Sequence, residues 1–263
     1  MDKLRITPVQ CALHWEDQRA NIERFDRLLR GLDGKTDVIV LPEMFTSGFT
    51  MRPAAVAEQM EGPSMKWMHT QALATAAVIT GSLVIEENGV YRNRLIWMRP
   101  DGSYDYYDKR HGFSPAGEHT IYERGQRRLI TTWHGWRVCP MVCYDLRFPA
   151  WSRNLNAAYD LLIYTANWPT ARAAHWRTLL RARAIENQAY CVGVNRIGTD
   201  DNGLHYRGDS QVIDMAGEVR WAAAVDEAVK TVTLDAGALR DYRKKLAFLA
   251  DATPFNFEGI ATL

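Results

Sequence analysis

Three reactive side chains stand where apolar stretches of the chain end. Glu43 follows the run "VIVLP", Lys109 follows "YDYYD", and Cys143 closes the run "PMVC". A charged side chain is expensive to bury, so one at the end of a buried strand requires a reason. Strand ends gather at one edge of a sheet, and such edges hold active sites. The set therefore predicts one shared site.

Each residue alone has an ordinary structural explanation. Glu43 fits a loop residue at the solvent, and Lys109 fits a surface lysine between Asp108 and Arg110. A lone cysteine such as Cys143 is most often an inert, buried, small apolar side chain. Only the three together indicate chemistry.

A thiol, a carboxylate and an ammonium can carry out nucleophilic catalysis. A free thiol has a pKa of about 8.5 and is mostly protonated at neutral pH. Lys109 nearby would stabilise the thiolate of Cys143, and Glu43 could accept the thiol proton as a general base. Attack on a carbonyl creates an oxyanion that needs preorganised donors, and the ammonium of Lys109 is one candidate.

The turn after Cys143 reads "CYDLRFP". Because Asp145 and Arg147 lie two residues apart, we predict that they form an ion pair that braces this turn. Binding of a substrate carboxylate is the alternative role for Arg147.

Composition limits the class of protein. The chain has 263 residues, enough for one large domain, with 47% hydrophobic residues and a formal net charge of +1. This charge argues against a dominant nucleic-acid-binding surface. The N-terminus lacks the apolar core of a signal peptide, and the longest uncharged run, residues 67–85, contains polar residues typical of a helix followed by a strand. We expect a cytoplasmic protein that binds no membrane.

The four cysteines, in a cytoplasmic chain, are expected to be reduced. The sequence has no CxxC, HxH or HExxH pattern and no phosphate-binding glycine motif, so it supports neither a metal site nor a nucleotide cofactor.

Helical periodicity alternates with apolar strands and hairpins, which predicts an α/β protein with mixed sheets. Asn88-Gly89 is a strong hairpin signal. Helices are predicted over residues 17–32, 64–77 (with Ser64 as its cap), 170–190 and 236–245, and a short helix is predicted at Pro149. Strands are predicted over residues 4–13, 37–43, 78–87, 90–99, 103–109, 136–143, 160–167, 191–198, 209–223 (a hairpin) and 229–234.

Five ordered motifs resemble the nitrilase superfamily of carbon–nitrogen hydrolases, in particular its omega-amidase branch. The motifs are "LPEMF", "YDKRH", "CYDLRFP", "YTANWP" and "HWRTLLRARAIENQAY". The resemblance implies a single αββα sandwich over residues 1–263, two mixed sheets flanked by helices, and a Glu43-Lys109-Cys143 triad. It also implies that the backbone N–H of Tyr144 helps to bind the oxyanion.

The resemblance implies a second glutamate beside the triad. "GEHTIYERG" offers Glu118 and Glu123, and we favour Glu118 because the family places this carboxylate shortly before an aromatic residue and a glycine turn. Trp168 could wall the substrate pocket or belong to the core. Arg172, near the start of a helix, could bind an anion or lie on the surface.

The implied activity is hydrolysis of the terminal amide of short dicarboxylate monoamides, such as 2-oxoglutaramate, through a cysteine thioester, with no metal or organic cofactor. Another hydrolase of the superfamily, acting on N-carbamoyl amides or nitriles, is the alternative. A peroxide-reactive thiol protein and a non-catalytic binding module are further alternatives. The resemblance implies a homodimer, and the apolar tail "TPFNFEGIATL" is predicted to lie across a neighbouring surface, such as the partner subunit.

Overall fold

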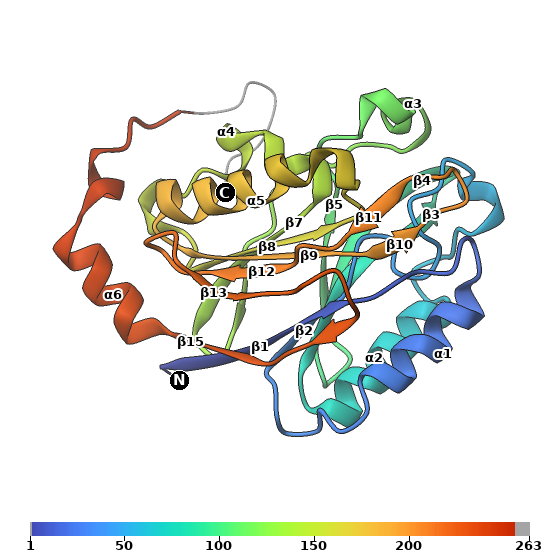
Figure 1. The fold of residues 1–263 in the computed structure, drawn as a ribbon, viewed down its shortest axis with the longest axis horizontal. Helices are drawn as coiled ribbons and strands as arrows, with labels where there is room; N and C mark the ends of the chain where they lie inside the picture. The colour runs from blue at the N-terminus through green and yellow to red at the C-terminus, as the bar shows by residue number, and fades with distance from the viewer. Residues whose placement is uncertain (1, 256–263) are drawn as a thin grey trace.

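The structure is a computed structural model that describes residues 2–255, and it contains two packed mixed sheets (Figure 1). The first sheet has the order β14-β1-β2-β3-β4-β5, with β15 also pairing with β1. Its strands are β1 (Lys3–Gln10), β2 (Val38–Val40), β3 (Val78–Glu87), β4 (Val90–Met98), β5 (Tyr104–Asp108), β14 (Ala228–Val229) and β15 (Val232–Asp235).

The second sheet has the order β13-β12-β9-β8-β7-β6. Its strands are β6 (Thr131–Trp133), β7 (Trp136–Val142), β8 (Leu161–Ala166), β9 (Tyr190–Asn195), β12 (Gln211–Ile213) and β13 (Val219–Ala222). A separate hairpin, β10 (Ile197–Thr199) with β11 (His205–Arg207), follows β9.

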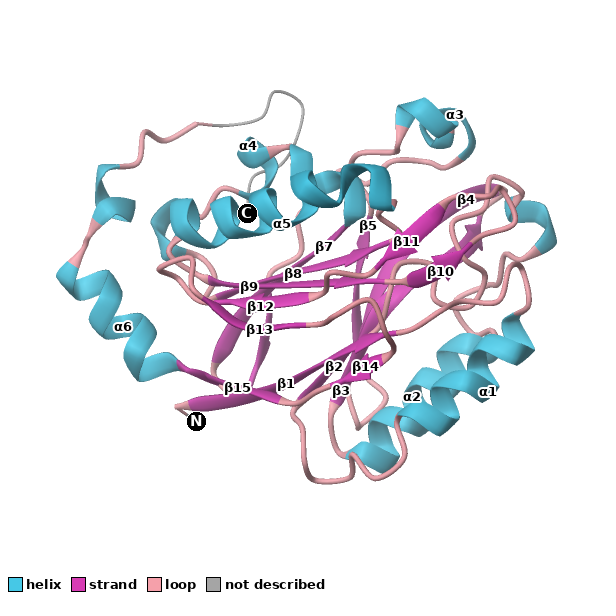
Figure 2. Ribbon diagram, viewed as in Figure 1, coloured by secondary structure: helices cyan, strands magenta, loops and turns pink. Residues whose placement is uncertain are grey.

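Helices cover the outer face of each sheet (Figures 1 and 2). α1 (Gln18–Leu28) and α2 (Pro63–Thr75) lie on the first sheet, whereas α4 (Pro149–Ser152) and α5 (Ala173–Asn187) lie on the second. The short α3 (Glu118–Ile121) lies near the end of β5, and α6 (Ala236–Lys245) runs along one end of the sandwich. This arrangement confirms the predicted αββα sandwich.

Both faces of the central strands are buried, which explains why they read as continuous apolar runs. In β2, Val38 and Val40 face the other sheet, whereas Ile39 packs under α1 and α2. The middle layer joins residues of both sheets, such as Ile6 and Leu161. A residue at the end of any of these strands is therefore fixed by packing on two sides.

The parallel strands determine where the site forms. β1, β2 and β3 are parallel in one sheet, and β7, β8 and β9 are parallel in the other. Glu43 follows β2, Cys143 follows β7 and Asn167 follows β8, each at a carboxyl end. Two stacked edges thus bring residues from distant parts of the chain together.

Most predicted elements are present, several of them shorter than predicted, such as β1, α1 and β2, and others need local correction. Gly62, not Ser64, precedes α2, because the Glu58 carboxylate takes the capping role and accepts from the Ser64 backbone N–H at 2.8 Å. The strand predicted over residues 229–234 is two strands, β14 and β15, which both pair with β1. The strand predicted over residues 191–198 ends at Asn195, after which the hairpin begins.

Two other predictions hold. The turn at Asn88-Gly89 joins β3 to β4 with both residues in the left-handed region (φ 57° and 78°). Pro140 lies inside β7, but β6 pairs with β7 only as far as Val138, so the proline stands where β7 has a partner on one side only. None of the described helices is long and apolar enough to cross a membrane.

Candidate active site

A buried charge cluster, formed by Glu43, Lys109 and Glu118, lies where the two sheet edges meet. The Lys109 ammonium is 2.8 Å from Glu43 Oε1 and 2.9 and 2.8 Å from the two carboxylate oxygens of Glu118. Lys109 is 3% exposed and both glutamates are 0% exposed. The structure thus joins Glu118, not Glu123, to Lys109; Glu123 is exposed.

Two asparagines hold these carboxylates in place. Asn93, in β4, donates from Nδ2 to Glu43 Oε1 at 2.9 Å and to Glu118 Oε1 at 3.1 Å. The backbone N–H of Asn167 donates to Glu43 Oε2 at 2.9 Å, and its side chain donates to the Glu43 carbonyl at 2.7 Å. Both oxygens of Glu43 therefore have fixed partners, and the carboxylate has one orientation.

Cys143 begins a tight turn at the end of β7. Its φ of 44° lies in the left-handed region, which a residue with a side chain rarely adopts. Its sulfur lies 3.9 Å from the carbonyl oxygen of Asn167, whose own N–H binds Glu43. The thiol is therefore adjacent to the buried charge cluster, and the turn directs it toward a cavity.

Asp145 braces this turn from inside the protein. Its Oδ2 accepts from the Val142 backbone N–H at 3.1 Å and from the Tyr107 hydroxyl at 2.8 Å. Its Oδ1 accepts from the His111 backbone N–H at 3.0 Å and lies 2.7 Å from His111 Nδ1. The carboxylate is fully buried, and these bonds hold the strained backbone beside Cys143.

The predicted ion pair between Asp145 and Arg147 is wrong. The turn is a 3-10 helix with three residues per turn, so side chains two positions apart point in different directions. Arg147 instead lies against Trp168, with its guanidinium 4.7 Å from the centre of the Trp168 ring and Nη2 3.1 Å from His175 Nδ1.

Burial and charge set the protonation of the site. Burial alone would lower the pKa of Lys109, but the carboxylates of Glu118 and Glu43 outweigh it and raise that pKa, so the ammonium stays charged. Burial and the nearby Glu43 carboxylate raise the pKa of the Cys143 thiol well above its usual value, and Lys109 opposes this only in part. The resting thiol is therefore protonated and needs a base. Burial also raises the pKa of Glu118.

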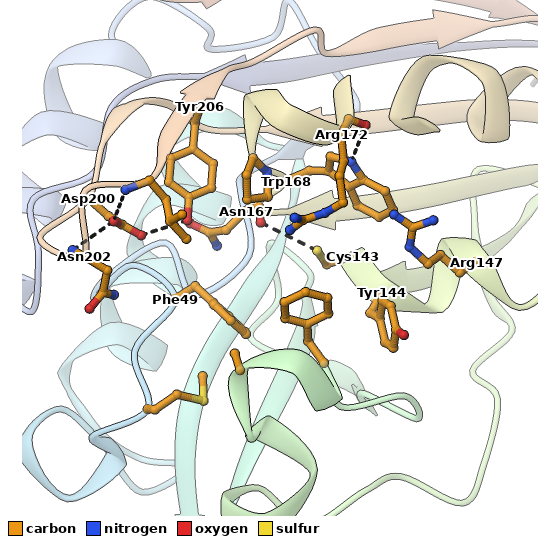
Figure 3. A pocket seen from close by; sticks show the side chains of 15 residues that line it. Phe49, Cys143, Tyr144, Arg147, Asn167, Trp168, Arg172, Asp200, Asn202 and Tyr206 are labelled. Carbon is orange, nitrogen blue, oxygen red and sulfur yellow. Dashed lines mark hydrogen bonds between the residues drawn. The ribbon is translucent and has the colours of Figure 1, made fainter. Parts of the chain in front are cut away.

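Cys143 opens into a cavity of about 310 Å³ (Figure 3). All four residues expected from sequence to bind substrate, Tyr144, Arg147, Trp168 and Arg172, line it. The remaining lining residues are Phe49, Met51, Phe113, Ala116, Asn167, Pro169, Asp200, Asn202, Leu204 and Tyr206. Figure 3 shows the Arg172 side chain directed toward Cys143, whereas Arg147 lies on the far side of Trp168.

Sequence reasoning missed the asparagines and the hairpin side of the cavity. Asn93 sits in the apolar strand "VYRNRLIWM", where an amide at a buried position was the available signal. Asp200, Asn202, Leu204 and Tyr206 come from the hairpin β10–β11, whose strands of three residues gave no pattern.

An αββα sandwich that gathers a cysteine, a lysine and two glutamates at one edge defines a class of hydrolases that act on carbon–nitrogen bonds other than peptide bonds. The chain belongs to the carbon–nitrogen hydrolase family, whose model matches residues 5–244.

Known relatives agree with this assignment. The chain is 49% identical to an omega-amidase, YafV, of Escherichia coli strain K12 over 97% of this chain and 99% of that protein. It is 26% identical to a 2-oxoglutaramate amidase of Bacillus subtilis over 95% of this chain and 97% of that protein. The crystal structure of XC1258 from Xanthomonas campestris, described as having an arsenic adduct in its active site, is 44% identical, with a TM-score of 0.96 over 98% of this chain and 100% of that one.

Proposed function

We propose that this protein is an omega-amidase, which hydrolyses the terminal amide of short dicarboxylate monoamides, such as 2-oxoglutaramate, to the dicarboxylate and ammonia. The observation that carries this proposal is the Lys109 ammonium held between two buried carboxylates beside the Cys143 thiol. The similarity to proteins named omega-amidase and 2-oxoglutaramate amidase supports the substrate class.

The first half of the reaction forms a thioester. Glu43 accepts the proton of the Cys143 thiol as the sulfur attacks the amide carbon, because the resting thiol is protonated. The negative charge moves to the carbonyl oxygen, which the Lys109 ammonium and the backbone N–H of Tyr144 bind. Glu43 then returns the proton to the amide nitrogen, the carbon–nitrogen bond breaks, and ammonia leaves.

The second half releases the acid. Glu43 accepts a proton from water, whose oxygen attacks the thioester carbon, and the same two donors bind the second oxyanion. The carbon–sulfur bond breaks, the sulfur recovers a proton from Glu43, and the carboxylic acid departs. No redox step or metal ion enters this scheme.

Glu118 acts through Lys109. Its two oxygens both accept from the ammonium, which fixes the position of the donor and offsets the cost of burying its charge. Glu118 is therefore a positioning residue in this proposal, together with Asn93.

Matched cysteine variants test the proposal. We expect Cys143→Ala to lower ammonia release from glutaramate by about three or more orders of magnitude, as deletion of other nucleophiles does. Cys139→Ala, which removes a buried cysteine of β7, the strand that precedes Cys143, should retain activity because Cys139 packs under α5. Near-normal release by Cys143→Ala would contradict the proposal. Faster ammonia release from an N-carbamoyl amino acid or a nitrile would favour the alternative hydrolases.

We also propose that residues 1–263 act as one domain in a cytoplasmic homodimer. The proposal for the tail concerns residues that lie mostly outside the described range, which ends at residue 255. Light scattering at micromolar concentration tests the dimer, and a monomeric mass would contradict it.

A further inference from the structure

The side chains that line the cavity beside Cys143 carry more positive than negative charge. Three charged residues line it: Arg147, Arg172 and Asp200. Neither arginine forms an ion pair with an acidic residue of the described range, whereas Arg5, Arg137 and Arg243, which are also partly buried, each do. An unpaired guanidinium at the wall of an apolar cavity is a site for an anion.

The two arginines differ in availability. Arg147 stacks on Trp168 and contacts His175, so its guanidinium is already occupied. Arg172 donates no side-chain hydrogen bond within residues 2–255; its guanidinium lies 5.3 Å from the centre of the Phe113 ring. Its backbone is fixed, because its carbonyl accepts from Trp168 Nε1 at 2.8 Å. Arg172 is therefore anchored at its backbone, and its side chain, which makes no hydrogen bond within residues 2–255, is directed toward Cys143 (Figure 3).

Asp200, the one acid among the lining residues, already accepts three hydrogen bonds. Its Oδ1 accepts from the backbone N–H groups of Asn202 and Leu204, both at 3.0 Å. Its Oδ2 accepts from the Tyr206 hydroxyl at 2.8 Å. An ammonium group on a substrate would lie near the Arg172 guanidinium. The Asp200 carboxylate is already hydrogen-bonded, so it would offset the desolvation of that ammonium group poorly.

We propose that Arg172 binds the carboxylate of the substrate, and that the hydrogen bond from the Tyr206 hydroxyl engages Oδ2 of Asp200, the one acid among the lining residues, and so weakens its binding of an ammonium group. This inference rests on the proposed amidase function and explains its selectivity. The cavity accepts monoamides with an anionic end and an uncharged carbon beside it, and it disfavours the corresponding 2-amino acids.

Three amides of matched length test the first half. Glutaramate carries the carboxylate, pentanamide replaces it with a methyl group, and glutamine adds a 2-amino group. For the wild type we expect kcat/KM for glutaramate to exceed that for pentanamide by about 10- to 100-fold, the size of one charge-assisted contact. If the wild type has equal kcat/KM values for glutaramate and pentanamide, the inference is wrong, whatever the variants show.

The variant Arg172→Met should bring the ratio of kcat/KM for glutaramate to that for pentanamide close to one, because the carboxylate contact is removed. Arg181→Met, an exposed arginine of α5, is the matched control and should keep the preference. If Arg172→Met keeps the glutaramate preference, the assignment is wrong. If the wild type releases no ammonia from any amide, the proposed function fails instead.

The variant Tyr206→Phe tests the second half. Removing the hydroxyl frees Oδ2 of Asp200, so the ratio of kcat/KM for glutamine to that for glutaramate should rise by about 10-fold. Adding Asp200→Asn to Tyr206→Phe should abolish the rise. An unchanged ratio in Tyr206→Phe with an intact thermal transition would overturn the role of this hydrogen bond.

Discussion

The Lys109 ammonium and the Glu43 carboxylate, 66 residues apart in sequence, lie 2.8 Å from each other in a place that water barely reaches. Burying two charges is costly, and a close pair with further hydrogen bonds only offsets that cost. Glu118 adds a second negative charge to the same ammonium. A cluster with this charge excess is poorly explained by stability alone, and its position beside Cys143 supplies the chemical reason.

Loss of the shared cation should destabilise the fold as well as the reaction. In Lys109→Met two buried carboxylates lose their counter-ion, so the free energy of unfolding at neutral pH should fall by about 3–5 kcal/mol. Burial already raises the pKa of Glu118, and loss of the ammonium that opposes this raises it further, so the deficit should shrink as the pH falls and Glu118 becomes protonated. Urea unfolding from pH 8 to pH 5 measures this. Lys66→Met, at an exposed site of α2, is the control, and a deficit independent of pH would contradict the argument.

The two candidate glutamates give a matched pair. Glu118→Gln removes a negative charge that holds Lys109, and we expect kcat to fall by about 100-fold or more, comparable to loss of an oxyanion donor. Glu123→Gln changes an exposed side chain five residues later and should leave kcat unchanged. Steady-state ammonia assays compare the two. Equal effects would mean that proximity to Lys109 does not matter.

Sequence motifs marked the residues that we propose to react, but they did not mark the residues that support them. Glu43 and Cys143 end apolar runs, and Lys109 ends the tyrosine-rich segment "YDYYDK", so their own neighbours in sequence mark them. Asn93 reaches both carboxylates only because the β3–β4 pairing and the fold of the chain after β5 bring these segments together. No local pattern encodes that meeting.

The same dependence on tertiary packing explains why the predicted ion pair between Asp145 and Arg147 is wrong. Nearness in sequence suggested that Asp145 would pair with Arg147, but Asp145 binds Tyr107 and His111, which lie 38 and 34 residues away. The layer order of the sandwich was predictable because continuous apolar strands such as β2 must be covered on both faces. Which polar side chains meet at the strand ends depends on tertiary packing.

The brace at Asp145 predicts a long-range effect of a buried hydroxyl. Tyr107→Phe removes a donor to Asp145 and the acceptor of Trp151 Nε1 at 2.9 Å. Stability should fall by about 1–3 kcal/mol, and kcat should fall because the turn at Cys143 loses support. Tyr106→Phe alters an exposed neighbour on the same strand, so both quantities should stay near wild type. A loss of stability with unchanged kcat would show that the brace does not position the thiol.

An ion cluster around Asp160, away from the candidate active site, should contribute to the loss of stability at acid pH. Asp160 accepts from Arg137 at 2.7 Å and from Arg243 at 2.8 Å. Burial alone would raise the pKa of Asp160, but hydrogen bonds and charge from Arg137, with Arg243, outweigh it and lower that pKa. This stabilisation is complete above the unfolded-state pKa of about 3.9 and is lost as the pH falls through the lower folded-state pKa.

Asp160→Asn should therefore reduce stability more at neutral pH than at about pH 3, where the wild type has begun to lose the same contribution. Urea unfolding of both proteins at the two pH values provides the comparison. A difference that grows toward acid pH would contradict the sign.

The most direct measurement is the intact mass of the enzyme quenched with acid during turnover of glutaramate. We predict an adduct equal to the substrate minus ammonia, located by peptide mapping on Cys143, removed by hydroxylamine and absent from Cys143→Ala. Ammonia release by the wild type with no such adduct, under conditions where hydrolysis of the intermediate limits the rate, would contradict the thioester mechanism.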